Sequence, residues 1–228
     1  MAYSASNPTE VDWRSNLVAI KNQKSCGSCW SFSANAAIEF AYNSLTNAKT
    51  PVSFSEQQLV DCSKGYPENG GCQGGLMDSA FQYVTDFGSE NQASYPYVGW
   101  LSLKCKYDAK KVVLKPKQLS GYVDVKAKDG QALEDAVAKR VVSIAIDASE
   151  LQSYTGGIIK HYKYEANNHG VAIVGYGVDA STPYYRVRNS WSEDWGESGY
   201  FRILKNTADK TQGLMGELLD SSYPLLSL

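Results

Sequence analysis

The sequence has 228 residues, with 22 Lys and Arg against 24 Asp and Glu, which gives a formal net charge of −2. This length suits one large domain or two modest ones and allows a sizeable core without help from a metal. Because the sequence has no basic stripe, neither nucleic acid nor an anionic membrane is expected as a partner. No apolar run approaches the roughly 20 residues that span a bilayer, and the first residues lack the apolar stretch of a signal peptide.

All five cysteines lie in the first 105 residues, at Cys26, Cys29, Cys62, Cys72 and Cys105. This asymmetry suggests two halves of different character. In an oxidising compartment, an odd count indicates two disulfides and one free thiol, which is the pattern of a reactive cysteine.

The first half of the chain has helical patterns. Small and apolar residues recur at helical spacing from Cys29 onward and predict a helix over about 29–44. Ser53 and Glu56 match a capping box, with Ser53 as the cap of a second, short helix. Apolar residues on one face from Met77 onward, between glycines, predict a third helix. The glycine-rich segment 64–75 is expected to be a loop.

Beyond about residue 112 the pattern changes to that of strands. Short β-branched or aromatic runs predict strands at 119–125, 141–147, 170–178, 184–190 and 200–205. A single helix is predicted among them at 130–140. We therefore expect an α+β fold, with a mainly helical lobe over residues 1–112 and a mainly β lobe over residues 113–228. The two lobes should meet along a cleft, where binding sites commonly lie.

Cys26 and Cys29 are three positions apart, a spacing that fits three kinds of site. A structural zinc site needs a second pair of ligands, but the other cysteines are isolated and the chain has two histidines. A redox dithiol of the thioredoxin kind follows a strand of a βαβ unit, whereas an all-helical lobe follows this motif and further cysteines compete for pairing. The third possibility leaves Cys29 free at a helix start, where amides and the helix dipole favour a thiolate. It fits more of the sequence than the other two.

A cysteine nucleophile needs an imidazole and a group that orients it. His169 begins a strongly apolar predicted strand and Asn189 ends the next one, so neighbouring strands would bring them together. Each residue alone is more simply explained as a turn or surface residue. His161 lies among lysines and tyrosines and is expected to be exposed and inert.

The segment QKSCGSCWSFS resembles the active-site segment of the papain family of cysteine proteases. The resemblance continues in order along nearly the whole chain, through VDWRS, SEQQLVDCS, GCQGGLMDSAFQYV, YTGGII, NHGVAIVGYG, NSWSEDWGESGYFRI and SSYP. QQLVDC and GCQGGLMD resemble the cathepsin L-like branch. Cys29 precedes His169 by 140 positions and Asn189 by 160, in the family's order.

The resemblance implies a papain-like fold, with a β-barrel-like second lobe and an N-terminal segment that crosses between the lobes. It implies a cysteine endopeptidase with Cys29 as nucleophile and His169 as its base and later acid. Asn189 would orient the imidazole under the cover of Trp191. The side chain of Gln23 and the backbone N–H of Cys29 would stabilise the oxyanion. The implied disulfides are Cys26–Cys72 and Cys62–Cys105.

The resemblance also implies a set of substrate-binding residues. They are the backbone strip Gly74 and Gly75, the specificity-pocket residues Leu76, Met77, Ala145, Asn167 and Gly170, and the neighbouring Gly27, Ser28, Asn168 and Trp191. Asp220 maps to the floor of the pocket. Its apolar walls imply that leucine or phenylalanine is accepted just upstream of the cleaved residue. A partly desolvated Asp220 would also accept arginine, and the alternative is a solvated carboxylate outside the pocket.

Three positions depart from the family pattern. Lys24 and Ser192 stand where glycine is usual, which puts the conformation of both loops in question. A third disulfide common in the β lobe is missing, and its two positions hold Lys163 and Met215. Such a bridge typically contributes about 2–4 kcal/mol, so the β lobe is expected to be the softer one.

The resemblance further implies a monomeric hydrolase without a cofactor or metal, made as a zymogen with a propeptide. Peptides, unfolded proteins and cystatin-like inhibitors would be its partners, in a lysosome or vacuole or after secretion. Internal cleavage is expected, because the chain lacks the two-histidine insertion of relatives that trim chain ends. The alternatives are a catalytically silent peptide-binding or storage protein and a different acyl transferase such as a transglutaminase. Cys29, His169 and Gln23 are all present, which favours the protease.

Overall fold

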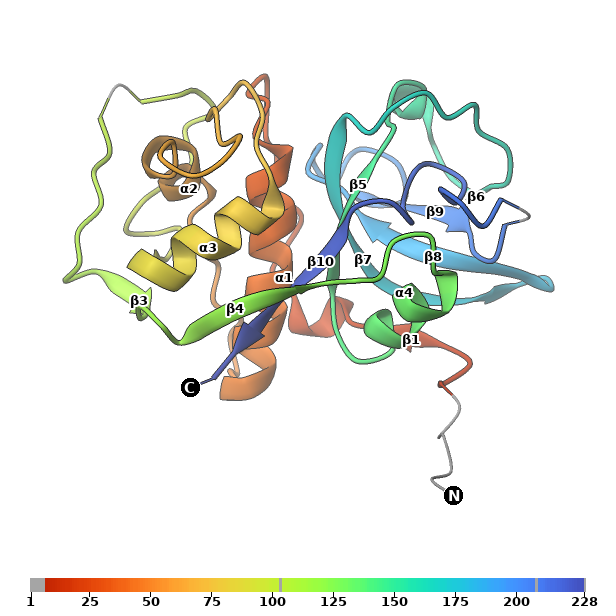
Figure 1. The fold of residues 1–228 in the computed structure, drawn as a ribbon, viewed down its shortest axis with the longest axis horizontal. Coiled ribbons are helices and arrows are strands. Elements are labelled where there is room, and N and C mark those ends of the chain that lie inside the picture. The colour runs from red at the N-terminus through yellow and green to blue at the C-terminus, as the bar shows by residue number, and fades with distance from the viewer. Residues whose placement is uncertain (1–6, 103, 208, 228) are drawn as a thin grey trace.

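The computed structural model describes residues 7–102, 104–207 and 209–227. The helices of residues 29–87 lie on one side, and most of the strands, together with the helix at 130–137, lie on the other (Figure 1). The helices are α1 (Cys29–Thr46), α2 (Glu56–Cys62), α3 (Met77–Phe87) and α4 (Gly130–Val137), with 3₁₀ turns at Arg14–Asn16 and Leu151–Ser153. The strands are β1 (Val11–Asp12), β2 (Ser89–Glu90), β3 (Val112–Leu114), β4 (Leu119–Asp124), β5 (Val142–Ile146), β6 (Ile158–Ile159), β7 (His169–Asp179), β8 (Thr182–Arg188), β9 (Tyr200–Leu204) and β10 (Ser221–Leu226). Within the described ranges, no helix is long and apolar enough to cross a membrane.

Helix α1 lies between the two groups of elements. It packs against α2 and α3 on one side and against β5, β7 and β10 on the other. Residues 30–40 are all buried, and many of them are small, so neighbours approach α1 from both sides. The helix ends where Asn47 adopts a left-handed φ of 48°. It is two residues longer than the predicted 29–44.

The start of α2 differs from the prediction. The N-cap is Ser55, whose hydroxyl accepts a hydrogen bond from the Gln58 N–H, and not Ser53. Ser53 belongs to an extended segment, where its carbonyl accepts from the Gln92 N–H at 2.8 Å. The capping-box assignment was therefore wrong, because pairing with residues 90–92 keeps the chain extended through Ser53.

The β lobe is built on an eight-stranded sheet. The strand order is β4-β10-β5-β7-β8-β9-β6, and β1 pairs separately with β7. The five predicted strands correspond to β4, β5, β7, β8 and β9. Strand β10 was not predicted, because Pro224 and the surrounding residues show no strand period. The proline is tolerated there because only Ser221 and Ser222 pair with β5, so beyond them β10 has one partner, β4.

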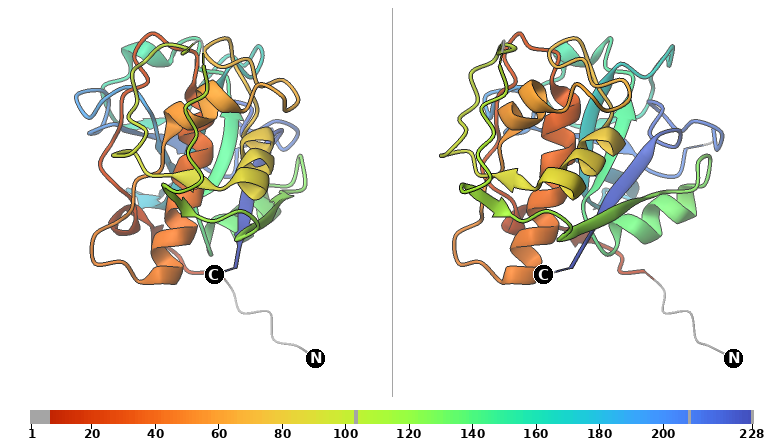
Figure 2. Two further views of the ribbon diagram at one scale, coloured as in Figure 1. Left: turned by 90° about the vertical axis from the view of Figure 1, so that its left-hand side faces the viewer. Right: turned by 60° about the vertical axis from the view of Figure 1, so that its left-hand side comes forward.

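The N-terminal segment joins the two lobes. Val11 and Asp12 pair with β7, and the chain then crosses to the start of α1. At the other end of the chain, β10 lies beside β4 and packs against α1, crossing in front of that helix in Figure 1 (see also Figure 2). One apolar core forms around α1–α3, and a second lies between α4 and the sheet. The lobe boundary at residue 112 stays a prediction. Strand β3 begins at that residue and pairs with β2, which precedes the boundary.

Candidate active site

Cys29 occupies the first position of α1, and it is the one of the five cysteines without a disulfide partner. Ser28 precedes it but does not cap the helix through its side chain. Its hydroxyl lies 2.7 Å from the Tyr97 hydroxyl instead. No side-chain cap therefore neutralises the start of α1, whose partial positive charge lies beside the Cys29 thiol.

A disulfide between Cys26 and Cys72 ties the start of α1 to the glycine-rich loop, and a second joins Cys62 and Cys105. The Gly27 N–H donates to the Cys72 carbonyl at 3.0 Å, and a Cβ on Gly27 would lie 2.5 Å from that oxygen. Only glycine allows this approach. Gly74 follows with a φ of 117° and open space around it, so its backbone is accessible from the cleft.

The start of β7 lies directly against the start of α1. A Cβ on Gly170 would lie 3.1 Å from the Trp30 Cα and 3.2 Å from its nitrogen, closer than most side chains permit. Ser33 fixes the same contact one turn further on, since its hydroxyl donates to the Val171 carbonyl at 2.6 Å. The two contacts hold His169, the residue before Gly170, close to Cys29.

The tautomer of His169 follows from its hydrogen bonds. Its Nε2 lies 2.8 Å from Asn189 Oδ1, which also accepts from the Ser190 N–H at 2.8 Å. Because the Ser190 amide can only donate, the Asn189 atom facing it must be oxygen, and Nε2 must carry the proton. Nδ1 is then the ring nitrogen without a proton. Trp191 covers the ring at 4.8 Å between centroids.

Gln23 is buried beside these residues, with 8% of its surface exposed. Its Nε2 donates to the Cys26 carbonyl at 3.0 Å, and its Oε1 accepts from the Ser190 hydroxyl at 2.6 Å. An amide nitrogen has two hydrogens, so one remains for another acceptor. The Gln23 backbone is fixed as well, because its N–H donates to the Ser190 carbonyl at 2.8 Å.

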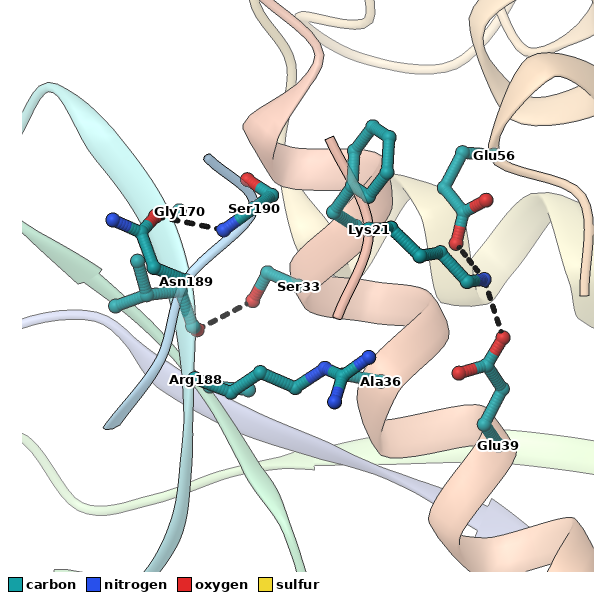
Figure 3. Close-up of a pocket in the computed structure, with 12 residues that line it drawn as sticks. Lys21, Ser33, Ala36, Glu39, Glu56, Gly170, Arg188, Asn189 and Ser190 are labelled. Carbon is teal, nitrogen blue, oxygen red and sulfur yellow. Dashed lines mark hydrogen bonds and ion pairs between the residues drawn. The ribbon is translucent and has the colours of Figure 1, made fainter. Parts of the chain in front are cut away.

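A buried charge network holds the crossing segment that carries Gln23. Figure 3 shows the Lys21 ammonium between Glu39 on α1 and Glu56 on α2, and the ion pairs measure 2.7 and 2.5 Å. Burial lowers the pKa of Lys21, but the two carboxylates outweigh this and raise it, so the ammonium stays charged. Arg188, next to Asn189, donates to the carbonyls of residues 18 and 19. These side chains line a small internal cavity of about 10 Å³ behind the site.

Burial opposes an isolated charge on either reactive group. It raises the pKa of the Cys29 thiol, although hydrogen bonding to nearby backbone amides works against it. It also lowers the pKa of His169 to about 4, against the hydrogen bond to Asn189. Moving the proton from the thiol to the imidazole leaves the net charge of the site unchanged. A thiolate in this site therefore depends on attraction to the imidazolium and to the helix start, and not on exposure to water.

A cleft cavity of about 820 Å³ lies between the lobes. Its lining includes Cys29 and His169 together with the predicted Gly74, Gly75, Leu76, Met77, Ala145, Asn167, Asn168, Gly170 and Asp220. The predicted Gln23, Gly27, Ser28, Asn189 and Trp191 do not line this cavity and lie beside it. Within the described residues, no group of three or more His, Cys, Asp or Glu side chains is arranged to hold a metal ion.

Asp220 lines the cavity but is exposed, which corrects the expected partial desolvation. Strand β10 starts one residue later. The Asp220 carboxylate accepts from Asn167 Nδ2 at 2.9 Å, a hydrogen bond that is itself exposed. Lys24 and Ser192 both have a left-handed backbone, with φ of 55° and 77°, a conformation that favours glycine. His161 is exposed, as predicted.

Several residues around the site were not predicted from the sequence. Ser190 fixes Asn189 and Gln23, and Tyr97 holds Ser28 and the Gln23 carbonyl. Glu56 was expected to cap a helix but pairs with a lysine 35 positions away. The sequence sign of this ion pair was Lys21, a charged residue two positions before Gln23. Its partners Glu39 and Glu56 could not be identified from the sequence, because both lie far from Lys21 along the chain.

Comparison with known proteins places this geometry in a family. Residues 7–218 match the papain family of cysteine proteases, and the chain belongs to that family. It is 44% identical over 225 residues to cysteine proteinase COT44 of Brassica napus, covering 96% of this chain and 66% of that protein. The chain spans between 58% and 66% of the length of the first curated relatives that it matches.

Solved structures agree with the family and its branch. Digestive procathepsin L 3 from the larval midgut of Tenebrio molitor matches with a TM-score of 0.89 and 40% identity, over 99% of this chain and 72% of that one. Bromelain from Ananas comosus, solved with the E64 inhibitor, matches with a TM-score of 0.87 and 34% identity, over 96% of this chain and 100% of that one. The papain-like two-lobe fold and the cathepsin L-like likeness are thus both confirmed.

Proposed function

We propose that the chain is a cysteine endopeptidase that cleaves peptide bonds through an acyl-enzyme. The observation that carries the proposal is the hydrogen-bonding of His169. The Ser190 amide fixes the orientation of Asn189, which leaves the unprotonated Nδ1 of a buried imidazole in the cavity that holds the free thiol of Cys29. This is the arrangement that thiol nucleophiles need.

In the proposed reaction, Cys29 Sγ attacks the substrate carbonyl while its proton passes to His169 Nδ1. The free N–H of Gln23 Nε2 and the backbone N–H of Cys29 stabilise the oxyanion, with a typical contribution of about 3 kcal/mol per donor. Nδ1 then protonates the leaving amine, and a thioester remains on Cys29. Water attacks the thioester, His169 accepts its proton, and that proton returns to the thiolate as the acid product leaves.

The proposal is tested by titration with an epoxysuccinyl inhibitor followed by intact-mass measurement. One equivalent should add rapidly to the wild-type chain and none to Cys29→Ser. The same variant should fold normally and lose hydrolysis of peptide amides, because a hydroxyl is far less acidic than a thiol. Turnover by a clean Cys29→Ser preparation would overturn the assignment.

Asn189→Ala should reduce kcat/KM less than His169→Ala does, because it removes an orienting group and leaves nucleophile and base in place. Equal losses in the two variants would show that Asn189 does more than orient the ring. Kinetics on a single fluorogenic peptide amide measure both variants.

We propose that the pocket lined by Leu76, Met77 and Ala145 accepts leucine or phenylalanine just upstream of the cleaved residue, and arginine through Asp220. Since Asp220 is exposed, its pairing with arginine is expected to contribute no more than about fivefold in kcat/KM. Asp220→Ala should lower kcat/KM for the arginine substrate alone. Equal effects on arginine and leucine substrates would place Asp220 outside the pocket.

Internal cleavage, an oxidising compartment and a propeptide complete the proposal. The two disulfides support the compartment, and the match to procathepsin L 3 supports a propeptide. We also propose a monomer without cofactor that acts on unfolded proteins and is bound by cystatin-like inhibitors. Digestion of an unfolded protein should yield internal fragments, and the release of dipeptides alone from one end would contradict it.

A further inference from the structure

We propose that a cavity in the β lobe, apart from the cleft, binds a free α-amino acid as its zwitterion. The cavity has a volume of about 430 Å³ and is bordered by the start of α4, by β8 and by the segments on either side of residues 209–217. The residues that line it and those that line the cleft form separate sets. The inference therefore concerns a second site, and it stands whether or not the chain is a protease.

A buried phenol without a partner lines this cavity. Tyr185 on β8 is 2% exposed, and its hydroxyl makes no hydrogen bond to any of the described residues. Burying a hydroxyl without a partner is unfavourable, and such a group in a folded chain calls for an explanation. A ligand in the cavity would supply the partner that the Tyr185 hydroxyl lacks.

A buried carboxylate lines the same cavity. Glu217 is 2% exposed, and its two oxygens accept from the Leu214 and Met215 N–H groups at 3.0 and 2.8 Å. No ion pair among the described residues involves Glu217. Burial raises its pKa, although hydrogen bonds from those amides work against the rise. A buried carboxylate is costly unless a cation compensates it, so an ammonium group is the partner that Glu217 lacks.

The buried lysine on this side of the lobe is engaged with another carboxylate. The Lys205 ammonium lies 5.9 Å from the centroid of the Tyr185 ring, but it pairs with Glu134 at 2.6 Å. Burial raises the pKa of Tyr185 well above its ordinary value, and the charges of Glu134 and Glu217 add to this rise. The phenol therefore keeps its proton, and its oxygen faces a region of negative potential. An ammonium placed there donates to the Glu217 carboxylate and to the Tyr185 oxygen.

The mouth of the cavity has lysines that are available to an anion. Lys128 and Lys210 line it, are exposed and take part in none of the ion pairs among the described residues. Asp129 and Asp209 also line it, but Asp129 caps α4 and pairs with a lysine outside the cavity, and Asp209 accepts hydrogen bonds from its own loop. A carboxylate at the mouth would therefore meet two unpaired ammonium groups.

An α-amino acid matches both ends of the cavity at once. Its ammonium would contact Glu217 and Tyr185, and its carboxylate would point toward Lys128 and Lys210. A simple amine would leave the lysines unpaired, and a simple carboxylate would leave Glu217 without a cation. Within the part of the chain that the structure describes, His, Cys, Asp and Glu side chains form no metal-binding group. The cation that we assign to Glu217 is therefore organic.

The test is an NMR titration of the ¹⁵N-labelled chain with three small ligands. They are L-alanine, L-alaninamide, which lacks the carboxylate, and propionate, which lacks the ammonium. Alanine should saturate with a Kd of about 1 mM, as a ligand of so few atoms allows. It should shift the amide signals of Leu214 and Met215, because both donate to Glu217, and leave those of Gly74 and Gly75 in the cleft unchanged. Alaninamide and propionate should each bind about tenfold more weakly or less, because one charged contact is lost.

Tyr185→Phe separates binding from structure. It removes only a hydroxyl without a partner, so the melting temperature should stay the same or rise while the affinity for alanine falls about tenfold. Tyr176→Phe is the matched control, because the Tyr176 hydroxyl already donates to the Pro8 carbonyl at 2.9 Å and Tyr176 does not line the cavity. This control should bind alanine as wild type does.

Two charge variants test the two ends of the ligand. Lys128→Gln should weaken the binding of alanine and leave that of alaninamide unchanged. Glu217→Gln should abolish the binding of both. The proposal would be overturned by alanine shifts that do not saturate, by equal affinities for alanine and alaninamide, or by equal losses in Tyr185→Phe and Tyr176→Phe.

Discussion

The two lobes hold the loops around the site by different means. Both disulfides are in the helical lobe, where one of them ties the glycine strip to the start of α1. The β lobe instead relies on buried carboxylates that accept hydrogen bonds from loop amides. Asp147 accepts from the N–H groups of Ser149 and Glu165 and the Ser149 hydroxyl, and Glu217 accepts from the N–H groups of Leu214 and Met215.

Asp147 lies close to Lys163 and Met215, the two positions at which the sequence resemblance led us to expect a third disulfide in relatives. It is fully buried and contacts Glu165 N at 2.7 Å and the Tyr162 hydroxyl at 3.5 Å, on either side of Lys163. The difference between the lobes shows that a disulfide and a hydrogen-bonded carboxylate can hold comparable loops in place. We expect the disulfide constraint to be lost in reductant and the carboxylate hydrogen bonds to be lost in acid.

The largest expected effect is the loss of the Cys26–Cys72 bridge in a Cys26→Ser/Cys72→Ser double variant. The two disulfides close loops of similar length, with sequence separations of 46 and 43, so removal of either should cost about 4 kcal/mol by the loop-entropy relation. Only the first anchors the glycine strip, so at low temperature its loss should also reduce kcat/KM, while Cys62→Ser/Cys105→Ser should not. Equal activity losses would show that the strip does not depend on its own bridge.

A smaller effect, about 1–3 kcal/mol, is expected for Asp147→Asn, because a charged hydrogen-bond acceptor is lost from a buried site. Burial alone would raise the pKa of Asp147, but the hydrogen bonds from Ser149 and from backbone amides lower it to about 2. A depressed pKa means that the stabilisation is fully present above the ordinary value near pH 4 and is lost as pH falls through about 2. Denaturant unfolding at several pH values should show the variant approaching wild type in strong acid.

Glu193→Gln serves as the control for this comparison, since Glu193 is exposed in the same lobe. It should leave unfolding unchanged across the range. If Asp147→Asn were equally destabilised at pH 2 and pH 7, shape rather than charge would be what holds the loop.

The smallest effect is expected at Lys24 and Ser192, two of the non-glycine residues with a left-handed backbone, one in each lobe. Lys24→Gly and Ser192→Gly should each stabilise the chain by about 1 kcal/mol or less, because the left-handed penalty is partly offset by the greater freedom of glycine when unfolded. Thermal unfolding of the two single variants measures this. A gain at Ser192 alone would indicate that the disulfide-linked helical lobe tolerates strain better than the β lobe does.

Local sequence determined much of the fold and of the candidate site. The helical period that starts at Cys29, the strand run that starts at His169, the strand run that ends at Asn189 and the glycines beside Cys72 each depend on neighbours within a few residues. Such patterns fix which elements form and which side chains they can present. The order of the motifs along the chain indicated the protein family, and the family resemblance in turn predicted which cysteines form disulfides.

Tertiary structure alone decided the contacts between distant residues. Ser55, and not Ser53, caps α2, because residues 90–92 pair with the segment before that helix and keep it extended. Strand β10, with Pro224 in it, formed because β4 and the end of β5 supplied partners. The tautomer of His169 depends on an amide of residue 190, and the exposure of Asp220 depends on how two lobes meet. Each is set by a partner whose position follows from the packing of the whole chain and not from any local period.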